Sequence, residues 1–525
     1  MRITSLGHAG LRLETEDVRL LMDAWLSPRG AFQAAWFQLP SNHHIDVAGL
    51  VEECNWVTVS HEHLDHMDVS VLSRLPASTR VLINAYESPN LRERLRRAGI
   101  RHVIEVPAWT RFELNTRGDW LTFIPEESPM CQDAAVLVCA GGVSVLHVND
   151  ARLTVAQVRR AAHEVGGTLD VMAIQVSGAS WHPICYEYPP AQMQQISSAK
   201  RIGKFKAVAR LIRAGRPTLA VPFAGPPCFL DPVLQQHNRW IPEPGIFPDL
   251  EQATDWLRDH LAGQRIEFWN PGDSYEPRSS IVIREPRWEG FSFSDLDRYL
   301  EDYAEARRPD IDAEWADHPE PGDDFPERFE EHMRRLGELS SYFLERIDLT
   351  VRFEVEGSGG GRWDAFFEPD GVRVDLSGSR RDVQYRFRVA SRWLAPVIER
   401  RIGWEDLLLS LRFSAWRHPD IYNDYLVGLL KHAEPVVLSA VEDYESRRDR
   451  DERVVVQGAD AKYEVDRYCP HAGEDLAEGG VVVNGVLRCL GHNFEFDLAT
   501  GRCINARCDP ITSRRLGSEP VPSVP

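Results

Sequence analysis

Short apolar runs typical of β-strands, separated by turn residues, dominate the first 290 residues. Longer segments with apolar residues at helical spacing interrupt them. Many strands with occasional helices favour two sheets covered by helices over a single Rossmann-type sheet, and no GxGxxG or Walker loop follows the first strand. We therefore predict an α/β sandwich of the αββα type over residues 1–290. The clearest strand runs are residues 2–6, 18–22, 57–60, 143–148, 171–176 and 218–222, and the clearest helical runs are 91–98 and 155–164.

The second part of the chain, residues 291–445, has a different pattern. Its acidic, proline-rich stretch 308–330 predicts a linker or a solvated loop. Alternation of apolar and polar residues then predicts strands, and apolar residues at helical spacing predict an amphipathic helix over 390–401. This α+β arrangement is similar to a sterol-carrier-like module, which would line a substrate pocket or brace its neighbours. The predicted strands are 349–356, 364–367, 372–376, 383–389 and 407–413.

The last segment, residues 451–518, reads as an all-β domain with two short metal-binding motifs. One contains Cys469 and His471, and the other contains Cys489 and His492. A zinc finger groups cysteine with cysteine, whereas here each loop offers one cysteine and one histidine. Each loop can therefore give its cysteine to one iron and its histidine to the other, so the pattern resembles a Rieske [2Fe–2S] domain. Structural zinc is the alternative.

A second cluster of potential ligands follows the strand 57–60. The sequence His61-Glu-His63-Leu-Asp65-His66 delivers three imidazoles and a carboxylate within six residues. His61 and His63 can bind one metal ion, while Asp65 and His66 can face a second. This HxHxDH motif at a strand end resembles the metallo-β-lactamase fold, and the early His8 could reach the same pocket or be a core histidine.

Such a site needs further ligands downstream. Asp150, at the end of the strand 143–148, matches the position of the bridging aspartate in that fold, with helix capping as the alternative. The usual intervening histidine is missing, and Glu126 and Glu127 stand in its place. We take Glu127 as the ligand, which would shift the preference from zinc toward iron. His182 is a further candidate ligand or acid, and Asp65 and His182 are the candidate catalytic groups.

Several stretches together resemble the CMP-N-acetylneuraminate hydroxylase family. That resemblance implies a Rieske oxygenase, in which dioxygen is activated at iron and electrons arrive through the cluster from a reductase. The family has its Rieske domain first, whereas here it is last, so we carry over the reaction class and not the sugar-nucleotide substrate. The stretches are Met22-Asp-Ala-Trp-Leu26 with Trp36, Gly178-Ala-Ser-Trp-His-Pro183, Ala220-Val-Pro-Phe-Ala-Gly225 and Trp416-Arg-His-Pro-Asp-Ile-Tyr422.

Composition limits the choice of partners and compartment. The formal net charge is −20 and the pI about 5.4, which disfavours binding to nucleic acid or to an anionic membrane. No apolar run approaches the length of a membrane span, and the first residues lack the layout of a signal peptide. Two of the nine cysteines belong to the cluster motifs, and the others are best explained as mostly reduced thiols, so we expect a cytoplasmic protein.

We therefore predict an oxidoreductase, a Rieske non-haem iron monooxygenase with one or two irons. It would use O₂ and an external electron donor, a ferredoxin or an NAD(P)H-dependent reductase, to hydroxylate or N-oxygenate a small polar metabolite. A homo-oligomer is expected if the two metal sites are far apart within one chain. The alternatives are a zinc-dependent hydrolase with the Rieske domain as a redox sensor, and a pure electron carrier. The basic run Lys200, Arg201, Lys204 and Lys206 could bind an anion or form a solvated helix face.

Overall fold

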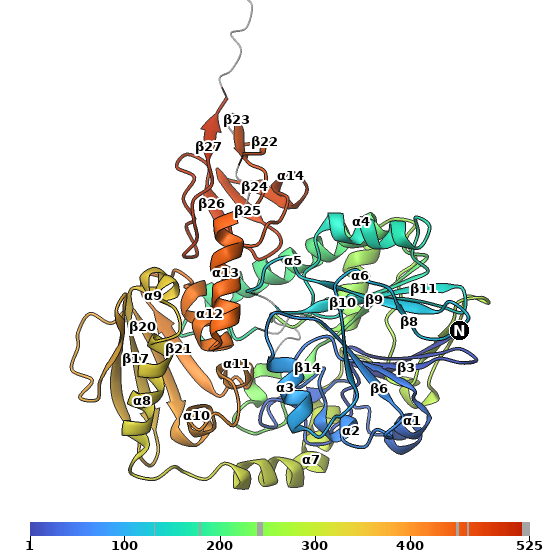
Figure 1. The fold of residues 1–525 in the computed structure, drawn as a ribbon, viewed down its shortest axis with the longest axis horizontal. Coiled ribbons are helices and arrows are strands. Elements are labelled where there is room, and N and C mark those ends of the chain that lie inside the picture. The colour runs from blue at the N-terminus through green and yellow to red at the C-terminus, as the bar shows by residue number, and fades with distance from the viewer. Residues whose placement is uncertain (131, 178–179, 239–244, 448–450, 459–460, 517–525) are drawn as a thin grey trace, which may run out of the picture.

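The computed structural model describes residues 1–130, 132–177, 180–238, 245–447, 451–458 and 461–516. Gly178 and Ala179 of one of the stretches named above lie outside these ranges, as do the last two residues of the expected 451–518 segment. Figure 1 shows three bodies, an N-terminal sandwich, a middle module and a C-terminal segment that stands above the place where the other two meet.

Two mixed sheets form the N-terminal sandwich. The first has the strand order β16-β15-β1-β2-β3-β5-β6-β7, and the second has the order β13-β12-β11-β10-β9-β8. The first sheet consists of β1 (Arg2–Gly7), β2 (Gly10–Glu14), β3 (Arg19–Met22), β5 (Trp56–Thr58), β6 (Arg80–Asn84), β7 (Val103–Val106), β15 (Ser274–Glu276) and β16 (Ile281–Ile283). The second consists of β8 (Phe112–Glu113), β9 (Trp120–Pro125), β10 (Ala134–Ala140), β11 (Val143–His147), β12 (Val171–Gln175) and β13 (Leu219–Phe223).

Three apolar layers hold this sandwich together. One lies between the two sheets and contains Leu11, Phe123 and Val145. Another packs the first sheet against its covering helices, and a third packs the second sheet against the others. This layering confirms the αββα sandwich predicted from the sequence. The helices are α1 (Val47–Glu53), α2 (Val69–Leu72) and α3 (Asn90–Arg97) on the first sheet, and α4 (Val155–Glu164), α5 (Pro190–Gly215) and α6 (Leu250–His260) on the second.

The middle module has one sheet in the order β19-β18-β17-β20-β21, packed against helices around a separate core. The predicted α+β character is confirmed. The strands are β17 (Leu349–Glu356), β18 (Gly361–Glu368), β19 (Gly371–Asp375), β20 (Tyr385–Ala390) and β21 (Phe413–Arg417), and the helices are α8 (Phe325–Gly337), α9 (Ser341–Ile347), α10 (Ser391–Ile398), α11 (Trp404–Leu409), α12 (Asp424–His432) and α13 (Pro435–Arg447).

Two local predictions for this region are wrong. The expected linker is largely helical, because α7 (Asp297–Asp317) continues through Pro309 and buries Tyr303 and Ile311 against the sandwich. The expected strand 407–413 overlaps helix α11, whose six residues are all buried. The overlapping residues 407–409 are all leucine and all buried, and so short an apolar run does not distinguish a buried helix from a buried strand.

The C-terminal segment is built from two small sheets, as the all-β prediction requires. Their orders are β22-β23-β27 and β24-β25-β26, and the two candidate ligand loops flank the second sheet. The elements are β22 (Arg453–Gln457), β23 (Lys462–Asp466), α14 (Leu476–Gly479), β24 (Gly480–Val483), β25 (Val486–Cys489), β26 (Glu495–Asp497) and β27 (Ser513–Arg515). In the described residues, no helix is long and apolar enough to cross a membrane.

A mostly buried ion pair fastens the C-terminal segment to α5 of the sandwich. Arg210 Nη1 lies 2.9 Å from Glu474 Oε1, and only 14% and 7% of the two side chains are exposed. Burial raises the pKa of Glu474, and Arg210 partly opposes that rise. The Arg210 guanidinium therefore compensates the charge of the Glu474 carboxylate, which is poorly solvated because it is buried.

Replacing Arg210 with methionine is expected to destabilise this junction by about 3 kcal/mol, because Glu474 would stay buried without its counter-ion. Chemical denaturation monitored at the C-terminal segment would measure the loss. The matched control is Arg213→Met on the same helix, an exposed arginine whose replacement should change stability by about 0.5 kcal/mol or less. If Arg210→Met and Arg213→Met unfold alike, the pair does not fasten the junction.

Candidate metal centres

The HxHxDH motif occupies the loop that follows β5. Its start is fixed by Asp23 at the end of β3, which accepts hydrogen bonds from the Ser60 amide at 2.8 Å and from the Ser60 hydroxyl at 2.6 Å. Ser60 Oγ in turn lies 2.9 Å from His61 Nδ1. The carboxyl ends of two neighbouring parallel strands thus orient the first imidazole of the motif.

The structure brings the predicted residues into two triplets, and every member except His8 is buried. His61, His63 and Asp150 form one triplet, and within it the potential ligand atoms lie within 4.8 Å of one another. The other triplet consists of His8, Asp65 and His66 and meets the same criterion. His66 Nε2 lies 3.3 Å from Asp150 Oδ1, so the two triplets adjoin. This arrangement can hold two metal ions side by side.

A further layer of hydrogen bonds orients these groups. His66 Nδ1 lies 3.0 Å from Asp23 Oδ2, and its buried Nε2 faces Asp150 Oδ1 without a well-aligned hydrogen bond. Gln175 Nε2 donates to Asp150 Oδ1 at 2.6 Å. Asp65 Oδ1 is likewise buried without a partner. Buried polar atoms that lack partners but face each other are what a metal site requires, and hydrogen-bonded outer groups fix their orientation.

The electrostatics of Asp65, Asp150 and His61 suit metal ligands, whereas Asp150 and Asp65 outweigh burial and raise the pKa of His66 in the metal-free protein. Burial acts to raise the pKa of Asp65, but His66 and His8 outweigh it and lower the pKa to about 2. The pKa of Asp150 is lowered as well, against the effect of burial, chiefly by His66. Burial lowers the pKa of His61 to about 4, so its imidazole is neutral near pH 7. Metal ligands bind in these deprotonated forms.

Sequence reasoning missed Glu405, which reaches the site from α11 of the middle module. Glu405 Oε1 lies 3.2 Å from His63 Nε2 and 2.8 Å from Lys431 Nζ. Burial acts to lower the pKa of His63, but the Glu405 carboxylate outweighs it and raises the pKa to about 9. No motif surrounds Glu405, so only the docking of the middle module reveals its position.

At the place of the missing histidine, Glu126 is buried next to Asp133, and its carboxylate accepts a hydrogen bond from the Arg152 amide at 2.8 Å. Burial first, and then Asp133, raise the pKa of Glu126 to about 7, and Asp133 also acts to raise the pKa of His61 and His63. Glu127, which the sequence predicted as a metal ligand, belongs to neither of the two triplets of candidate ligands. Its carboxylate accepts a hydrogen bond from Thr154 at 3.3 Å and lies close to Gly473 of the C-terminal segment. Adjacent residues beyond the end of β9 point in different directions, which the sequence alone does not resolve.

His182 also lies outside both triplets. Its Nε2 is 3.0 Å from the Tyr188 hydroxyl and 3.2 Å from Arg417 Nη2, at the contact between the sandwich and the middle module. Burial, together with the charges of Lys200 and Arg417, lowers its pKa, so the ring stays neutral. The structure therefore gives His182 a position among hydrogen bonds rather than beside the candidate metal ligands.

The four candidate cluster ligands converge at one end of the C-terminal segment. The rings of His471 and His492 lie 4.4 Å apart, Cys469 and Cys489 are buried, and the Cys489 thiol raises the pKa of Cys469. His471 Nδ1 and His492 Nε2 are buried without a hydrogen-bond partner. Two thiols and two imidazoles with spare buried nitrogen atoms fit the Cys₂His₂ ligation of a Rieske cluster.

Comparison with known families agrees with this geometry. The family model of the Rieske [2Fe-2S] domain matches residues 435–517. The chain ends in a Rieske domain. The family model of the β-lactamase superfamily domain matches residues 2–196 and covers the HxHxDH loop. The combination of an N-terminal metallo-β-lactamase-like domain with a C-terminal Rieske domain, predicted from the two motifs, is confirmed.

Relatives share the whole length of this chain. A Mycobacterium tuberculosis protein named as a Rieske 2Fe-2S iron–sulfur protein is 29% identical over 98% of this chain and 100% of its own length. One from Mycolicibacterium smegmatis with the same description is 27% identical over the same shares. Among solved structures, CmlA, a diiron β-hydroxylase from Streptomyces venezuelae, aligns over 54% of both chains with 16% identity. Its TM-score of 0.35 is too low to support a conclusion about this chain.

Helix α12 joins the Rieske domain to the metallo-β-lactamase-like site. At its first turn, Asp424 Oδ2 lies 2.7 Å from His471 Nε2, and Asp424 keeps a lowered pKa despite its burial. At its last turn, Lys431 contacts Glu405, which contacts His63. The two ends are seven residues apart, about 10 Å along a helix. Helix α12, with polar contacts at each end, therefore connects the two ligand sets within one molecule.

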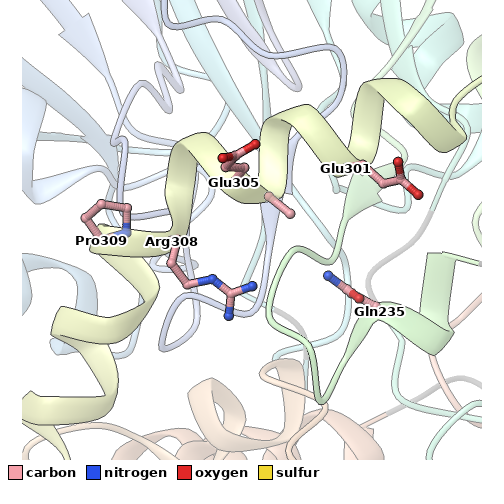
Figure 2. Close-up of a pocket in the computed structure, with 6 residues that line it drawn as sticks. Gln235, Glu301, Glu305, Arg308 and Pro309 are labelled. Carbon is pink, nitrogen blue, oxygen red and sulfur yellow. The ribbon is translucent and has the colours of Figure 1, made fainter.

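Hollows elsewhere on the surface contain none of these ligand sets. The pocket in Figure 2 has a volume of about 480 Å³ and lies beside α7, with Gln235, Glu301, Glu305 and Arg308 in its lining. A second, of about 340 Å³, has Glu126 and Glu127 in its lining together with Trp109 and Arg160. Of the two, only the second includes Glu126 and Glu127, the residues at the place of the missing histidine.

Proposed function

We propose that this chain is an oxygenase that combines a Rieske cluster with a non-haem iron centre in the metallo-β-lactamase-like domain. Its substrate would be a small polar metabolite that is hydroxylated or N-oxygenated, with electrons from an external ferredoxin or reductase. The observation that carries the proposal is the run of contacts from His471 through Asp424 and α12 to Glu405 and His63. A redox-silent hydrolase has no use for such a connection.

The residues divide into two ligand sets. Cys469, Cys489, His471 and His492 would hold the [2Fe–2S] cluster, and the two triplets around His61 and His66 would hold two irons. When bound, the cluster supplies single electrons and the iron centre supplies the site at which dioxygen is activated. The pairing of one carboxylate with two imidazoles in the triplet of His61 matches the ligand preference of non-haem iron.

The protein's own groups prepare that site. Asp23 fixes the tautomer of His66, and Gln175 orients Asp150. Glu126 lies next to Asp133, whose charge acts on His61 and His63, and its pKa is about 7, so it can hold or release a proton near neutral pH. The middle module closes over His63 through Glu405 and thereby limits the access of water. Oriented ligands, a carboxylate that can exchange a proton and limited access of water suit an oxidation that consumes both protons and electrons.

The test is metal analysis of the full chain purified without oxygen. Cys469→Ser is expected to lose the two irons of the cluster and its electron paramagnetic resonance signal while the remaining iron stays bound. His61→Ala combined with Asp65→Ala is expected to do the reverse. Cys54→Ser, which changes a buried cysteine of the sandwich that lies in neither ligand set, is the control and should change neither metal.

The outcomes separate the alternatives. Iron that survives Cys469→Ser and disappears with His61→Ala/Asp65→Ala supports the oxygenase. Zinc in that position instead would favour a metal-dependent hydrolase, in which a metal-bound hydroxide attacks an ester or phosphodiester and the Rieske domain senses redox state. A protein with no metal outside the cluster would contradict both.

A further inference from the structure

Lysine is rare in this chain, and two of its few lysines point inward next to the proposed oxygenase centre. Five lysines stand among 60 basic residues, at positions 200, 204, 206, 431 and 462. Lys200 and Lys204 are one turn apart on α5 and share a helix face, whereas Lys206 and Lys462 are exposed. The basic run is thus not a uniformly solvated helix face.

Neither inward lysine has a counter-ion. Lys200 Nζ donates to the His182 carbonyl at 2.8 Å and to Ser180 Oγ at 3.2 Å, and Lys204 Nζ donates to Gln175 Oε1 at 2.6 Å. Within the part of the chain that the structure describes, no carboxylate comes within ion-pair distance of either ammonium group. Burial is the largest cause that lowers the pKa of Lys200 to about 7 and that of Lys204 to about 8. Both lysines are half-buried, and a charge that is partly withdrawn from water without a directly paired counter-ion is costly.

A third cation completes the cluster from the middle module. Arg417 on β21 is 6% exposed, and its Nη2 reaches the ring of the same His182 whose carbonyl binds Lys200. Its Nε is paired with Asp420 at 2.7 Å, but its Nη1 is buried without a hydrogen-bond partner. The positive charges of Arg417 and Arg152 both act on Lys200. The cluster therefore has unused capacity to bind an acceptor.

Its position relates it to both metal centres. Lys204 contacts Gln175, which contacts the candidate ligand Asp150. On the other side, the charge of Lys204 acts on the candidate cluster ligand His492, and Asn493 of the same loop lies against Gly203. A group held by these cations would lie beside the metal centre, at the junction of all three domains.

We infer that Lys200, Lys204 and Arg417 bind the acid group of the substrate, a carboxylate or a phosphate, and hold its reacting part toward Asp150 and the histidines. The substrate of the proposed oxygenase is then an anionic small molecule. This inference rests on the proposed function, because it assigns the substrate class of the proposed oxygenase. Binding of the anion to these side chains can nevertheless be measured without turnover.

The chemistry favours an anion over a structural role for these side chains. An acid group between the two ammonium groups would give each an oppositely charged partner, which their three neutral acceptors do not supply. In a protein of net charge −20, a group of half-buried cations also provides the local attraction that an anionic substrate needs. Lysine, a compact point charge with three rotatable donors, suits an acid group of variable geometry.

Lysine labelling in the intact holoprotein tests the inference directly. The protein is treated with a limiting amount of an acetylating reagent in the presence and absence of inorganic phosphate or of benzoate. Mass spectrometry then gives the labelling rate of each of the five lysines. We expect one of the two anions to slow labelling of Lys200 and Lys204 at least fivefold while Lys206 and Lys462 are unchanged. The more protective anion identifies the acid group.

Calorimetry of the same anion with variants provides the second measurement. Lys200→Met and Lys204→Met should each weaken binding about tenfold, the loss of one charge-assisted hydrogen bond, while Lys206→Met stays within twofold. No protection by either anion, or equal affinities in all three variants, overturns the inference. If a variant fails to fold, labelling of the unmodified protein decides alone. Iron and cluster contents are measured on each sample, so a missing iron centre counts against the proposed function and not against anion binding.

Discussion

Replacing Asp424 with asparagine is expected to raise the reduction potential of the Rieske cluster by about 60–130 mV and to slow reoxidation of the reduced cluster by O₂ 10–100-fold. The variant loses a carboxylate that lies 2.7 Å from His471 Nε2 and is largely buried, with 14% of its side chain exposed. A charge-assisted hydrogen bond contributes about 1.5–3 kcal/mol, and about 59 mV corresponds to 1.4 kcal/mol for one electron. Loss of negative charge favours the reduced cluster, so the potential rises.

The slower reoxidation of the reduced cluster in Asp424→Asn has two causes. A higher cluster potential lowers the driving force for electron transfer to the iron centre, and replacement of an outer partner of a metal-bound histidine typically costs 10–100-fold in activity. Redox titration followed by electron paramagnetic resonance gives the potential, and stopped-flow absorbance gives the rate. Asp443→Asn on α13 makes the same charge change at an exposed site and should leave both unchanged. An unaltered rate in Asp424→Asn would mean that electrons do not leave through His471.

Replacing Glu405 with glutamine is expected to weaken Fe²⁺ binding 10–100-fold at pH 9, with a much smaller difference near pH 7. Glutamine can still accept a hydrogen bond from His63, but it carries no charge, and outer partners of metal-bound histidines contribute to affinity on this scale. The pH dependence follows from His63. Its pKa of about 9 means that a proton competes with the metal throughout the neutral range in the parent protein.

The Fe²⁺ affinity of the parent protein and that of Glu405→Gln should depend on pH in different ways. Without the Glu405 charge the pKa of His63 falls, so the variant loses proton competition at a lower pH and its affinity levels off earlier. The ratio of parent to variant affinity should therefore grow from pH 7 to pH 9. In the metal-free protein, the raised pKa means that the His63–Glu405 pair stabilises the fold fully below about pH 6.5, and this contribution is lost as the pH rises through about 9.

Anaerobic titration with Fe²⁺ against a competing chelator at several pH values measures these affinities. Glu399→Gln, a carboxylate of the same module that pairs with arginines on the surface, is the control and should behave as the parent protein. A ratio that stays constant with pH would show that Glu405 does not set the protonation of His63. Loss of the metal at every pH would instead indicate that Glu405 is itself a ligand.

Local sequence was sufficient for the features that depend on neighbouring residues. The spacing of Cys469 and His471, and of Cys489 and His492, predicted the Rieske domain because each short loop supplies one ligand of each kind. The six residues from His61 to His66 predicted the metallo-β-lactamase-like fold in the same way. The alternation of strands and helices predicted the sandwich, since burial imposes a characteristic period on each element.

Tertiary structure decided everything that depends on contact between the modules. Glu405, Asp424 and Arg417 stand far along the chain from the groups they touch, and none belongs to a motif that names its partner. The inward direction of Lys200 and Lys204, and the outward direction of Glu127, follow from how α5 and the loop after β9 are covered by other segments. Periodicity and spacing record the surroundings of a residue along the chain, whereas docking between distant segments is fixed by packing in space.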